Sequence, residues 1–583
     1  MIRRIGETGG PRLVVLGLDG AGFNYLDPIL ESGRLEGFSR LFASGVRSDC
    51  LSTIPPITPP AWSTMLTGVN PGKHGVLDFL QPDSSGVFRM VDATFRRRKT
   101  FLAHAVDNGI RTISLLVPYT FPPDPDAGGL VVSGLGTPSA ESDFIRPHKF
   151  RGRLLRDFPF LQETEATRGR SLDNLHERLL EHTRNAVDLV RWAMKEIDDW
   201  GLCFGVFQAT DLIPHFYSRF FDPDHPEYDA DDNEVAAGYR DALAAIYRAI
   251  DPLVGECLDA LEAEGGWVIL VSDHGSRPLM GAIGKDAFLA RWLEEEGYLV
   301  TRGAAGRARQ AAKAKAGSVA NRLLYLVKRY TPHGLRDAAN RLLGRRKEAI
   351  VSGLSAVPFL EDVDWKKTRA FCAPGGYGVG LYINREGDFP EGVVPKGAAY
   401  HKLREEMKDS LRALEIAPGV PLFTRVLLRE EALWGPAVAL APDLILMWRE
   451  DRRLAENDYR LTDGRRLDRP EKKPGSDLTW CGTHSMEGLF AIAGDGVRSG
   501  AILETPPNLA DVLPTVHLVA DLPIPSDVDG RVIENAFEPA FLKDHPPKMG
   551  PPEDGPPMRD QAGVSEEESE KLLDLLEGLG YLH

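Results

Sequence analysis

The stretch of sequence that decides the fold is R-L-V-V-L-G-L-D-G, residues 12–20. Its apolar residues continue without alternation, which is typical of a strand buried on both faces of a parallel sheet. The run ends in Asp19 and Gly20, so a carboxylate directly follows the strand. Because ligands of open α/β sheets bind outside the carboxyl ends of the strands, Asp19 is a candidate site residue. The alternative for Asp19 is an ordinary turn before a helix.

The same combination of buried strand and helix recurs along the chain. Strands are predicted at residues 110–117, 130–133, 202–208, 267–271, 378–383, 443–447 and 489–493. Helices are predicted at residues 25–30, 35–42, 171–200, 234–264 and 400–414. This alternation predicts an α/β fold with a mainly parallel sheet that is flanked by helices.

The composition narrows the classes of protein to which the chain can belong. With 43% hydrophobic and 26% charged residues in a chain of 583, it has the composition of a soluble globular protein. A net charge of −16 argues against general binding of nucleic acid. The five cysteines are scattered and form no C-x-x-C pair, which predicts neither a disulfide framework nor a thiolate zinc site. No run reaches the roughly 18 apolar residues of a membrane span, so a cytoplasmic location is expected.

A second stretch, T-P-P-A-W-S-T-M-L-T-G-V-N-P-G-K-H-G at residues 58–75, predicts a helix that begins near Thr58. Proline is tolerated in the first turn of a helix because an N–H there has no partner within the helix. A helix N-terminus favours an anion through its free N–H groups and its dipole. Thr58 is therefore either an ordinary N-cap or a nucleophile that faces a phosphate. In the same stretch, His74 is expected to order its loop and Trp62 to pack in the core.

Carboxylates and imidazoles recur where the predicted strands end. T-D-L-I-P-H contains Asp211 and His215, V-S-D-H-G contains Asp273 and His274, and C-G-T-H-S contains His484. Because the ends of parallel strands meet at one edge of a sheet, these side chains are expected to converge. Carboxylate and imidazole ligands suit Zn²⁺ and related divalent ions. Together the motifs predict a metal site, although each alone also fits a turn or a hydrogen-bonded histidine.

These motifs, in this order, resemble those of the alkaline phosphatase superfamily, and in particular its type I phosphodiesterase/nucleotide pyrophosphatase family. The resemblance covers most of residues 12–535, including V-L-G-L-D-G, P-G-K-H-G and A-D-V-L-P-T-V-H-L. It implies an alkaline-phosphatase-like core of three layers, α/β/α, with a mainly parallel sheet. It also implies two divalent metal ions, with Zn²⁺ favoured and Mn²⁺ or Fe as alternatives. The implied ligands are Asp211, His215 and His484 for one ion, and Asp19, Asp273, His274 and the bridging Thr58 for the other.

The function that the resemblance implies is hydrolysis of a phosphodiester or pyrophosphate bond in a small phosphorylated substrate. Thr58 would attack phosphorus and form a phosphoryl-threonine intermediate. A phosphomonoesterase or phosphomutase of the same superfamily is an alternative, and a non-catalytic, metal-dependent binder of a phosphorylated ligand is another. No Lys or Arg follows Thr58 before Lys73, which favours a diester over the more highly charged monoester. The basic run at residues 96–99 is either a solvated surface stretch or a clamp for the remaining phosphate charge.

The pattern also divides the chain into parts. The predicted parts are a catalytic core at residues 1–280 and 351–545, a basic helical insertion at 281–350, and a Pro-rich linker with a C-terminal helix at 546–583. Ser565 and Glu568 form a capping box, which predicts where the last helix begins.

The basic insertion has a composition unlike that of the remaining chain. Residues 302–347 contain 13 Lys and Arg but one acidic residue, Asp337. Apolar residues within this segment recur at helical spacing, which predicts basic amphipathic helices. The insertion is either a solvated cap over the cleft or a surface that contacts anionic lipid. In the second case the protein would associate peripherally with a membrane.

Overall fold

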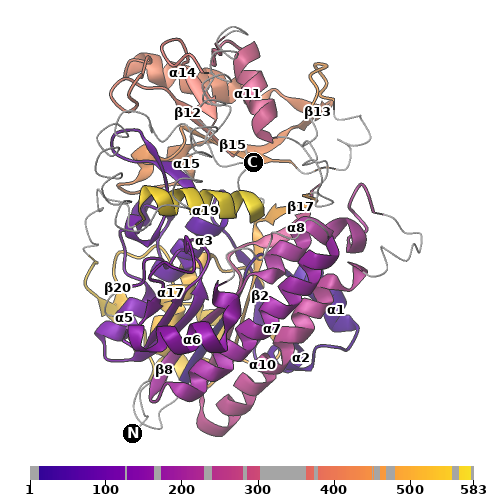
Figure 1. The fold of residues 1–583 in the computed structure, drawn as a ribbon, viewed down its shortest axis with the longest axis vertical. Coiled ribbons are helices and arrows are strands. Elements are labelled where there is room, and N and C mark those ends of the chain that lie inside the picture. Colours follow the sequence, from indigo (N-terminus) through magenta and orange to yellow (C-terminus); the bar gives the residue numbers. More distant parts are fainter. Residues whose placement is uncertain are drawn as a thin grey trace, which may run out of the picture.

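A nine-stranded sheet forms the centre of the protein (Figure 1). The computed structural model describes residues 12–124, 128–162, 172–228, 239–279, 285–302, 363–372, 379–449, 451, 460–467, 480–553 and 564–579. In spatial order the strands are β19 (Ala501–Ile502), β2 (Val46–Leu51), β18 (Glu487–Gly494), β9 (Gly266–Val271), β1 (Arg12–Leu18), β8 (Trp200–Phe207), β5 (Arg111–Val117), β6 (Leu130–Ser133) and β7 (Ile145–Arg146).

The central strands of this sheet run parallel to one another. β1 pairs in parallel with β8 and β9, and β5 pairs in parallel with β8 and β6. β18 is antiparallel to both β9 and β2, and β7 is antiparallel to β6. β8 and β9 are buried along their whole lengths, which explains their continuous apolar sequences. The prediction of a mainly parallel sheet is confirmed.

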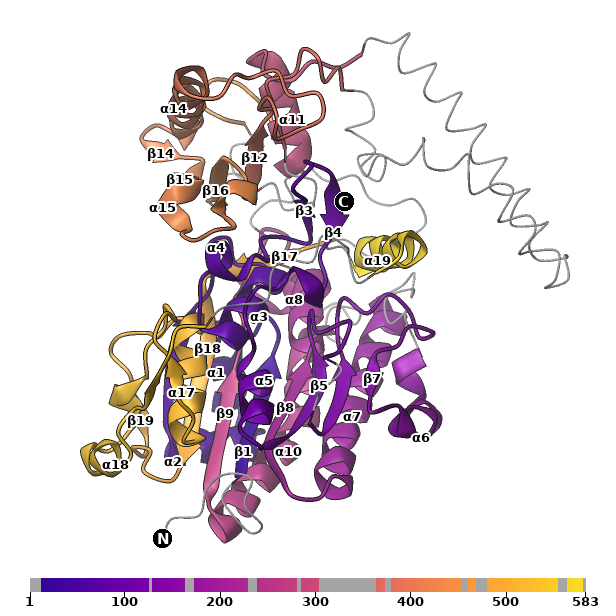
Figure 2. The same ribbon diagram turned by 90° about the vertical axis from the view of Figure 1, so that its left-hand side faces the viewer.

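Helices cover both faces of the sheet, and Figure 2 looks onto the face that carries α5 and α17. One face packs against α1 (Phe23–Glu31), α2 (Glu36–Ser44), α7 (Leu172–Glu196), α8 (Ala209–Phe221) and α10 (Ala242–Glu264). The other packs against α3 (Thr58–Thr67), α5 (Phe101–Asp107) and α17 (Val512–Val519). Val14 and Leu16 of β1 enter the first apolar cluster, whereas Leu13 and Val15 enter the second. The core is therefore a three-layer α/β/α arrangement, as predicted.

A smaller lobe lies beyond the carboxyl edge of the large sheet (Figures 1 and 2). It contains the antiparallel strands β11 (Ala370–Cys372), β12 (Gly380–Ile383), β16 (Leu444–Trp448) and β15 (Phe423–Leu428), with helices α11 (Lys285–Glu295) and α14 (Ala398–Arg412). The N–H of Ala437 donates to the carbonyl of Gly72 over 2.8 Å, which joins this lobe to α4 (Pro71–His74).

Most of the predicted basic insertion at residues 281–350 falls outside the part of the chain that the structure describes, which includes only residues 285–302 of it. Residues 303–362 belong to the undescribed part, and they include nearly all of residues 302–347. The described helix α11, at the start of the predicted insertion, buries Phe288, Leu289 and Trp292 in the core. The predicted division of the chain into core, insertion and tail stays a prediction.

β2 and the end of α7 differ from the pattern of the sequence. β2 is not predicted, because Arg47, Asp49 and Leu51 lie on its more exposed side and interrupt the apolar run. The predicted helix at 171–200 ends at Glu196, since Asp199 adopts a left-handed φ of 53° and Trp200 already belongs to β8.

Shorter elements are β3 (Leu80–Pro82), β4 (Phe88–Met90), α6 (Arg151–Asp157), β13 (Glu415–Ala417), β14 (Val420–Pro421), α15 (Arg429–Ala432), β20 (Ile524–Pro525), α18 (Pro539–Asp544) and β21 (Met549–Gly550).

The last helix packs against the core. α19 (Glu566–Leu579) begins with the predicted capping box, in which the N–H of Ser565 donates to Glu568 Oε2 over 2.9 Å and the N–H of Glu568 donates to Ser565 Oγ over 3.3 Å. Leu572 and Leu576 are buried in the large apolar cluster. Within the described ranges, no helix combines the length and apolar character needed to cross a membrane.

Candidate metal centre and nucleophile

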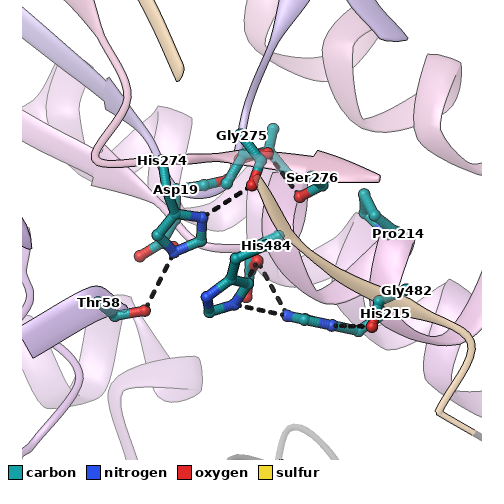
Figure 3. A network of polar contacts seen from close by, with 12 residues as sticks. Asp19, Thr58, Pro214, His215, His274, Gly275, Ser276, Gly482 and His484 are labelled. Carbon is teal, nitrogen blue, oxygen red and sulfur yellow. Dashed lines mark hydrogen bonds and ion pairs between the residues drawn. The ribbon is translucent and has the colours of Figure 1, made fainter. Parts of the chain in front are cut away.

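The predicted site residues converge at the carboxyl edge of the large sheet (Figure 3). Asp19 follows β1, Asp211 lies in the first turn of α8 directly after β8, and Asp273 and His274 follow β9. The antiparallel pairing of β10 (Gly275–Pro278) with β17 (Gly482–Ser485) places His484 opposite Ser276. The residues that are brought together, each at most 5% exposed, are Asp19, Thr58, Asp211, His215, Asp273, His274 and His484.

One group of candidate ligand atoms comes from α8 and β17. Asp211 and His215 are four residues apart on α8, so they share one helix face, and Asp211 Oδ1 lies 3.1 Å from His215 Nε2. His484 Nε2 lies 3.0 Å from His215 Nε2 and 3.6 Å from Asp211 Oδ1. Ligand atoms of a tetrahedral zinc ion with bonds of about 2.0–2.1 Å are separated by roughly 3.3 Å. The three atoms therefore have the spacing of ligands around one ion.

The second group lies at the ends of β1 and β9. His274 Nε2 is 3.3 Å from Asp273 Oδ2 and 3.7 Å from Asp19 Oδ1. Thr58 Oγ1 lies 3.4 Å from the same His274 nitrogen, although the two residues are 216 positions apart in the chain. This arrangement places a hydroxyl next to a second possible set of metal ligands. The rings of His274 and His484 stack with their centroids 3.8 Å apart, so the two groups adjoin each other.

The backbone orients the three imidazoles in the same way. His215 Nδ1 lies 3.0 Å from the carbonyl of Gly482. His484 Nδ1 lies 2.8 Å from the carbonyl of Pro56, and His274 Nδ1 lies 3.1 Å from the carbonyl of Gly275. Because a carbonyl oxygen only accepts hydrogen bonds, each Nδ1 carries the proton and each Nε2 of the neutral ring presents a lone pair. A hydrogen bond from the second ring nitrogen to a backbone carbonyl is typical of metal-ligating histidines, because it fixes the orientation of the ring.

The electrostatics of the site require a positive charge. Burial raises the pKa of Asp19 well above its usual value, and the carboxylates of Asp273 and Asp211 raise it further. Burial also raises the pKa of Asp273, to about 6. Asp19 Oδ1 and Asp273 Oδ2 are buried and have no hydrogen-bond partner among the described residues. Buried carboxylates and imidazole lone pairs that face one another fit divalent cations, so the residues present suit two such ions.

Asp211 differs from the other two carboxylates because imidazoles surround it. Burial alone would raise its pKa, but His215, His484 and His274 together hold the pKa of Asp211 below its usual value. For His484, burial lowers the pKa well below the usual value, and the neighbouring His274 lowers it further. An ionised Asp211 beside a neutral His484 is the protonation state that a bound metal ion requires.

Thr58 is the first residue of α3, and the N-cap of this helix is Ile57. The side chain of Thr58 makes no cap and instead faces His274, so the interpretation of Thr58 as an ordinary N-cap is wrong. Pro59 and Pro60 follow it and have no N–H. Of the first three residues of α3, only Thr58 therefore has a backbone N–H to offer an anion.

Residues that sequence reasoning did not assign to the site also hold its ligands. Trp62 packs in the core, as predicted, but its indole Nε1–H also donates to Asp19 Oδ2 over 3.0 Å. The N–H of Gly20 donates to Asp273 Oδ1 over 3.2 Å, and Thr210 Oγ1 donates to the Asp19 carbonyl over 2.6 Å. The position of Trp62, one helical turn after Thr58, is the signal that could have indicated its role.

His74 orders its loop, as predicted. Its Nε2 lies 2.9 Å from Thr64 Oγ1, and the N–H of Val76 donates to its Nδ1 over 3.1 Å. Burial is the main reason that the pKa of His74 falls to about 3, so this imidazole stays neutral.

The basic run at residues 96–99 is not a fully solvated stretch. Arg96 Nη1 donates to the Tyr119 carbonyl over 3.1 Å. Arg98 pairs with Asp527 over 2.5 Å, and the exposed Lys99 pairs with Asp107 over 2.7 Å. The side chains of Arg96, Arg98 and Lys99 are thus engaged by the protein.

The protein has an α/β/α fold, and its parallel strands end at buried carboxylates and imidazoles that face a threonine hydroxyl. This combination of fold and site is typical of a class of hydrolases. The family model described as type I phosphodiesterase/nucleotide pyrophosphatase matches residues 13–347, which is more than half of the chain. The protein belongs to this family and is a phosphoric ester hydrolase of the alkaline phosphatase superfamily.

Comparison with curated proteins gives no match. Among solved structures, phosphonoacetate hydrolase from Sinorhizobium meliloti 1021 is 15% identical, with a TM-score of 0.48, over 88% of this chain and 96% of that chain. Murine ectonucleotide pyrophosphatase/phosphodiesterase 5 is 12% identical, with a TM-score of 0.46, over 90% of this chain and all of that chain. At this identity and TM-score, neither likeness bears on what the present protein binds or cleaves.

Proposed function

We propose that the protein hydrolyses phosphodiester or pyrophosphate bonds with two divalent metal ions and with Thr58 as the nucleophile. The observation that carries this proposal is the position of Thr58 Oγ1, 3.4 Å from His274 Nε2, a nitrogen that also lies 3.3 Å from Asp273 Oδ2 and 3.7 Å from Asp19 Oδ1. Thr67, at the other end of α3, has its partner on its own helix, because its Oγ1 donates to the Ser63 carbonyl over 2.6 Å.

The proposed metal ligands form two sets that match the two groups of ligand atoms. Asp211, His215 and His484 would hold one ion; Asp19, Asp273, His274 and Thr58 would hold the other. A mixture of imidazole and carboxylate ligands favours Zn²⁺, with Mn²⁺ or Fe as alternatives.

Thr58 is the residue that changes covalently in this proposal. Its Oγ1 gives up its proton to solvent and forms a bond to phosphorus, while the bond from phosphorus to the leaving oxygen breaks and that oxygen takes a proton from solvent, which gives a phosphoryl-threonine. A water molecule then loses a proton and attacks phosphorus, the bond to Oγ1 breaks, and Oγ1 takes up a proton to restore the hydroxyl. When bound, the two ions supply positive charge that stabilises the attacking and the leaving oxygens.

The proposal of a diester or pyrophosphate substrate rests on the surrounding charge. A monoester dianion would need further cations beyond the two ions, and the side chains of Arg96, Arg98 and Lys99 are engaged elsewhere in the protein. A diester carries a single negative charge, which this surrounding suits better. A phosphomonoesterase or phosphomutase is the alternative within the superfamily.

The test is metal analysis of the purified protein, followed by turnover of bis(p-nitrophenyl) phosphate. We expect two ions per chain, loss of turnover on chelation and recovery on addition of Zn²⁺. Two bound ions and measurable affinity for inorganic phosphate, without turnover of any ester, would instead show a metal-dependent binder.

The peripheral membrane contact of residues 302–347 also stays a proposal, supported by their sequence charge of 13 basic residues against one acid. Co-sedimentation with vesicles of phosphatidylcholine and phosphatidylserine, at low and high salt, tests it. Absence of binding at low salt would leave only the role of a cap.

A further inference from the structure

Tyr119 lies at the same sheet edge as the metal centre, but the mechanism above does not use it. Tyr119 is the second residue after β5. The strand beside β5 in the sheet is β8, which leads to Asp211, and the strand beyond β8 is β1, which leads to Asp19. The side chain is 1% exposed, and its hydroxyl has no hydrogen-bond partner among the described residues. Since buried hydroxyls are almost always hydrogen-bonded, this one indicates a partner outside the described residues.

The backbone holds Tyr119 in a conformation that bulky residues avoid. Its φ is 55°, in the left-handed region. Two bonds maintain this conformation: the N–H of Tyr119 donates to the Leu135 carbonyl over 2.7 Å, and the Tyr119 carbonyl accepts from Arg96 over 3.1 Å. Its ring packs edge-on against Phe79, with the centroids 6.0 Å apart. Backbone strain that the surroundings enforce is concentrated at functional sites.

One of the charges that act on the phenol belongs to the candidate metal centre. Burial raises the pKa of Tyr119 well above its usual value, and the carboxylates of Asp78 and Asp19 raise it further. The phenol therefore stays protonated at neutral pH and remains a hydrogen-bond donor. Asp19 is one of the proposed metal ligands, so its charge acts on the hydroxyl from the site itself.

The site has few other donors for a phosphoryl group. Pro59 and Pro60 remove two of the N–H groups that a helix start usually presents, and only Thr58 keeps its own. Catalysis of phosphoryl transfer depends on donors that are fixed in place where charge develops.

We propose that the hydroxyl of Tyr119 donates a hydrogen bond to a non-bridging oxygen of the phosphoryl group that Thr58 attacks. Tyr119 is then a catalytic residue, in the sense that it contacts the reacting group. This inference rests on the proposed function. The partner that the buried hydroxyl lacks in the protein is the substrate.

Tyr119→Phe tests the inference, because it removes the hydroxyl and keeps the ring. We expect kcat/KM for bis(p-nitrophenyl) phosphate to fall about a hundredfold, the usual effect of losing one such donor. The loss should be the same for a diester with the poorer phenoxide leaving group, since the contact is to an oxygen that both substrates share. Two metal ions per chain should remain, and the Tm should stay or rise, because no protein partner loses a bond.

Tyr25→Phe is the matched control. Tyr25 is also buried, but its hydroxyl donates to Asp222 over 2.7 Å and lies outside the site. Its loss should lower the Tm and leave kcat/KM unchanged, the opposite pattern to Tyr119→Phe.

A binding measurement separates this inference from the proposed function. The affinity of the metal-loaded protein for inorganic phosphate, measured by calorimetry, should weaken about tenfold in Tyr119→Phe even if the wild type turns over no ester. Absence of turnover in the wild type would refute the proposed function alone. If Tyr119→Phe has the same kcat/KM and the same phosphate affinity as the wild type, the inference is overturned, and a buried water is the partner of the hydroxyl.

Discussion

The indole of Trp62 donates its N–H to Asp19 Oδ2 over 3.0 Å, while Asp19 Oδ1 faces His274 Nε2 at 3.7 Å. One oxygen of the carboxylate is thus held by the helix that begins with Thr58, and the other is directed into the metal centre. Trp62 is fully buried and packs against Phe204 of β8, with the ring centroids 5.9 Å apart. The same helix therefore carries the proposed nucleophile and orients a proposed metal ligand.

Trp62→Phe should weaken metal binding at the site of Asp19, because it removes the hydrogen bond but keeps an aromatic ring. Loss of a hydrogen bond to a ligand typically lowers metal affinity about 10–100-fold. Titration of the chelated protein with Zn²⁺ measures the effect. Trp292→Phe, a change of equal size in the smaller lobe, should leave both affinities unchanged. Equal affinities in the two variants would contradict the role of Trp62.

Substitution of single ligands should empty one site each. Asp273→Asn is expected to remove the ion at Thr58, and His484→Ala the other ion. Each loss should reduce the rate about a thousandfold or more. Metal analysis of the purified variants is the measurement, with His74→Ala as a buried histidine that the structure places outside the metal centre. Two retained ions in both ligand variants would refute the assignment.

Thr58→Ala should abolish turnover and leave both the fold and the remaining ligands intact. Thr58→Ser should keep measurable activity, since a hydroxyl remains in place. Mass spectrometry of acid-quenched enzyme should find phosphate on the peptide that contains Thr58. Thr67→Ala, at the other end of α3, removes a buried hydroxyl that bonds only to the Ser63 carbonyl and should not affect the rate. Undiminished turnover in Thr58→Ala would exclude the proposed nucleophile.

The stability of the metal-free protein should depend on pH through Asp273. Burial raises the pKa of this carboxyl to about 6 in the fold, compared with about 3.9 in an unfolded chain. Between these values the native state binds more protons than the unfolded state, so stability falls as the pH rises from about 4 to about 6. The difference in Tm between the chelated wild type and Asp273→Asn, followed with pH, isolates this contribution. The affinity for Zn²⁺ should rise with pH, whereas the stability of the metal-free protein falls. Below about pH 6 the affinity should decrease, because the ion must displace a proton from Asp273. A Tm difference that is constant across this range would contradict the prediction.

A diester should be the better substrate. We expect kcat/KM for bis(p-nitrophenyl) phosphate to exceed that for p-nitrophenyl phosphate by at least about tenfold, or about 1.4 kcal/mol. Initial rates at low substrate concentration give both values. A preference for the monoester would point to residues 96–99 as the missing clamp. Replacing Arg98, which pairs with Asp527, by Gln would then have to reduce that preference.

Much of the fold could be predicted because the central strands are buried on both faces. Their apolar runs, as in β8 and β9, are visible without any tertiary information. β2 could not be predicted in this way, because one of its sides is partly exposed and carries Arg47 and Asp49. Its place in the sheet depends on antiparallel pairing with β18, which lies more than 400 residues later in the chain.

The sequence by itself determined which residues lie at the carboxyl edge of a parallel sheet, and therefore that Asp19, Asp211 and Asp273 would meet. Only the tertiary structure decided how they meet. It shows which nitrogen of each imidazole carries the proton and which oxygen of Asp19 accepts the hydrogen bond from Trp62. It also shows that the hydroxyl of Tyr119 has no partner among the described residues. The physical reason is that periodicity along one segment reports burial of that segment alone. Hydrogen bonds between residues 43 or 216 positions apart depend instead on how separate elements pack against one another.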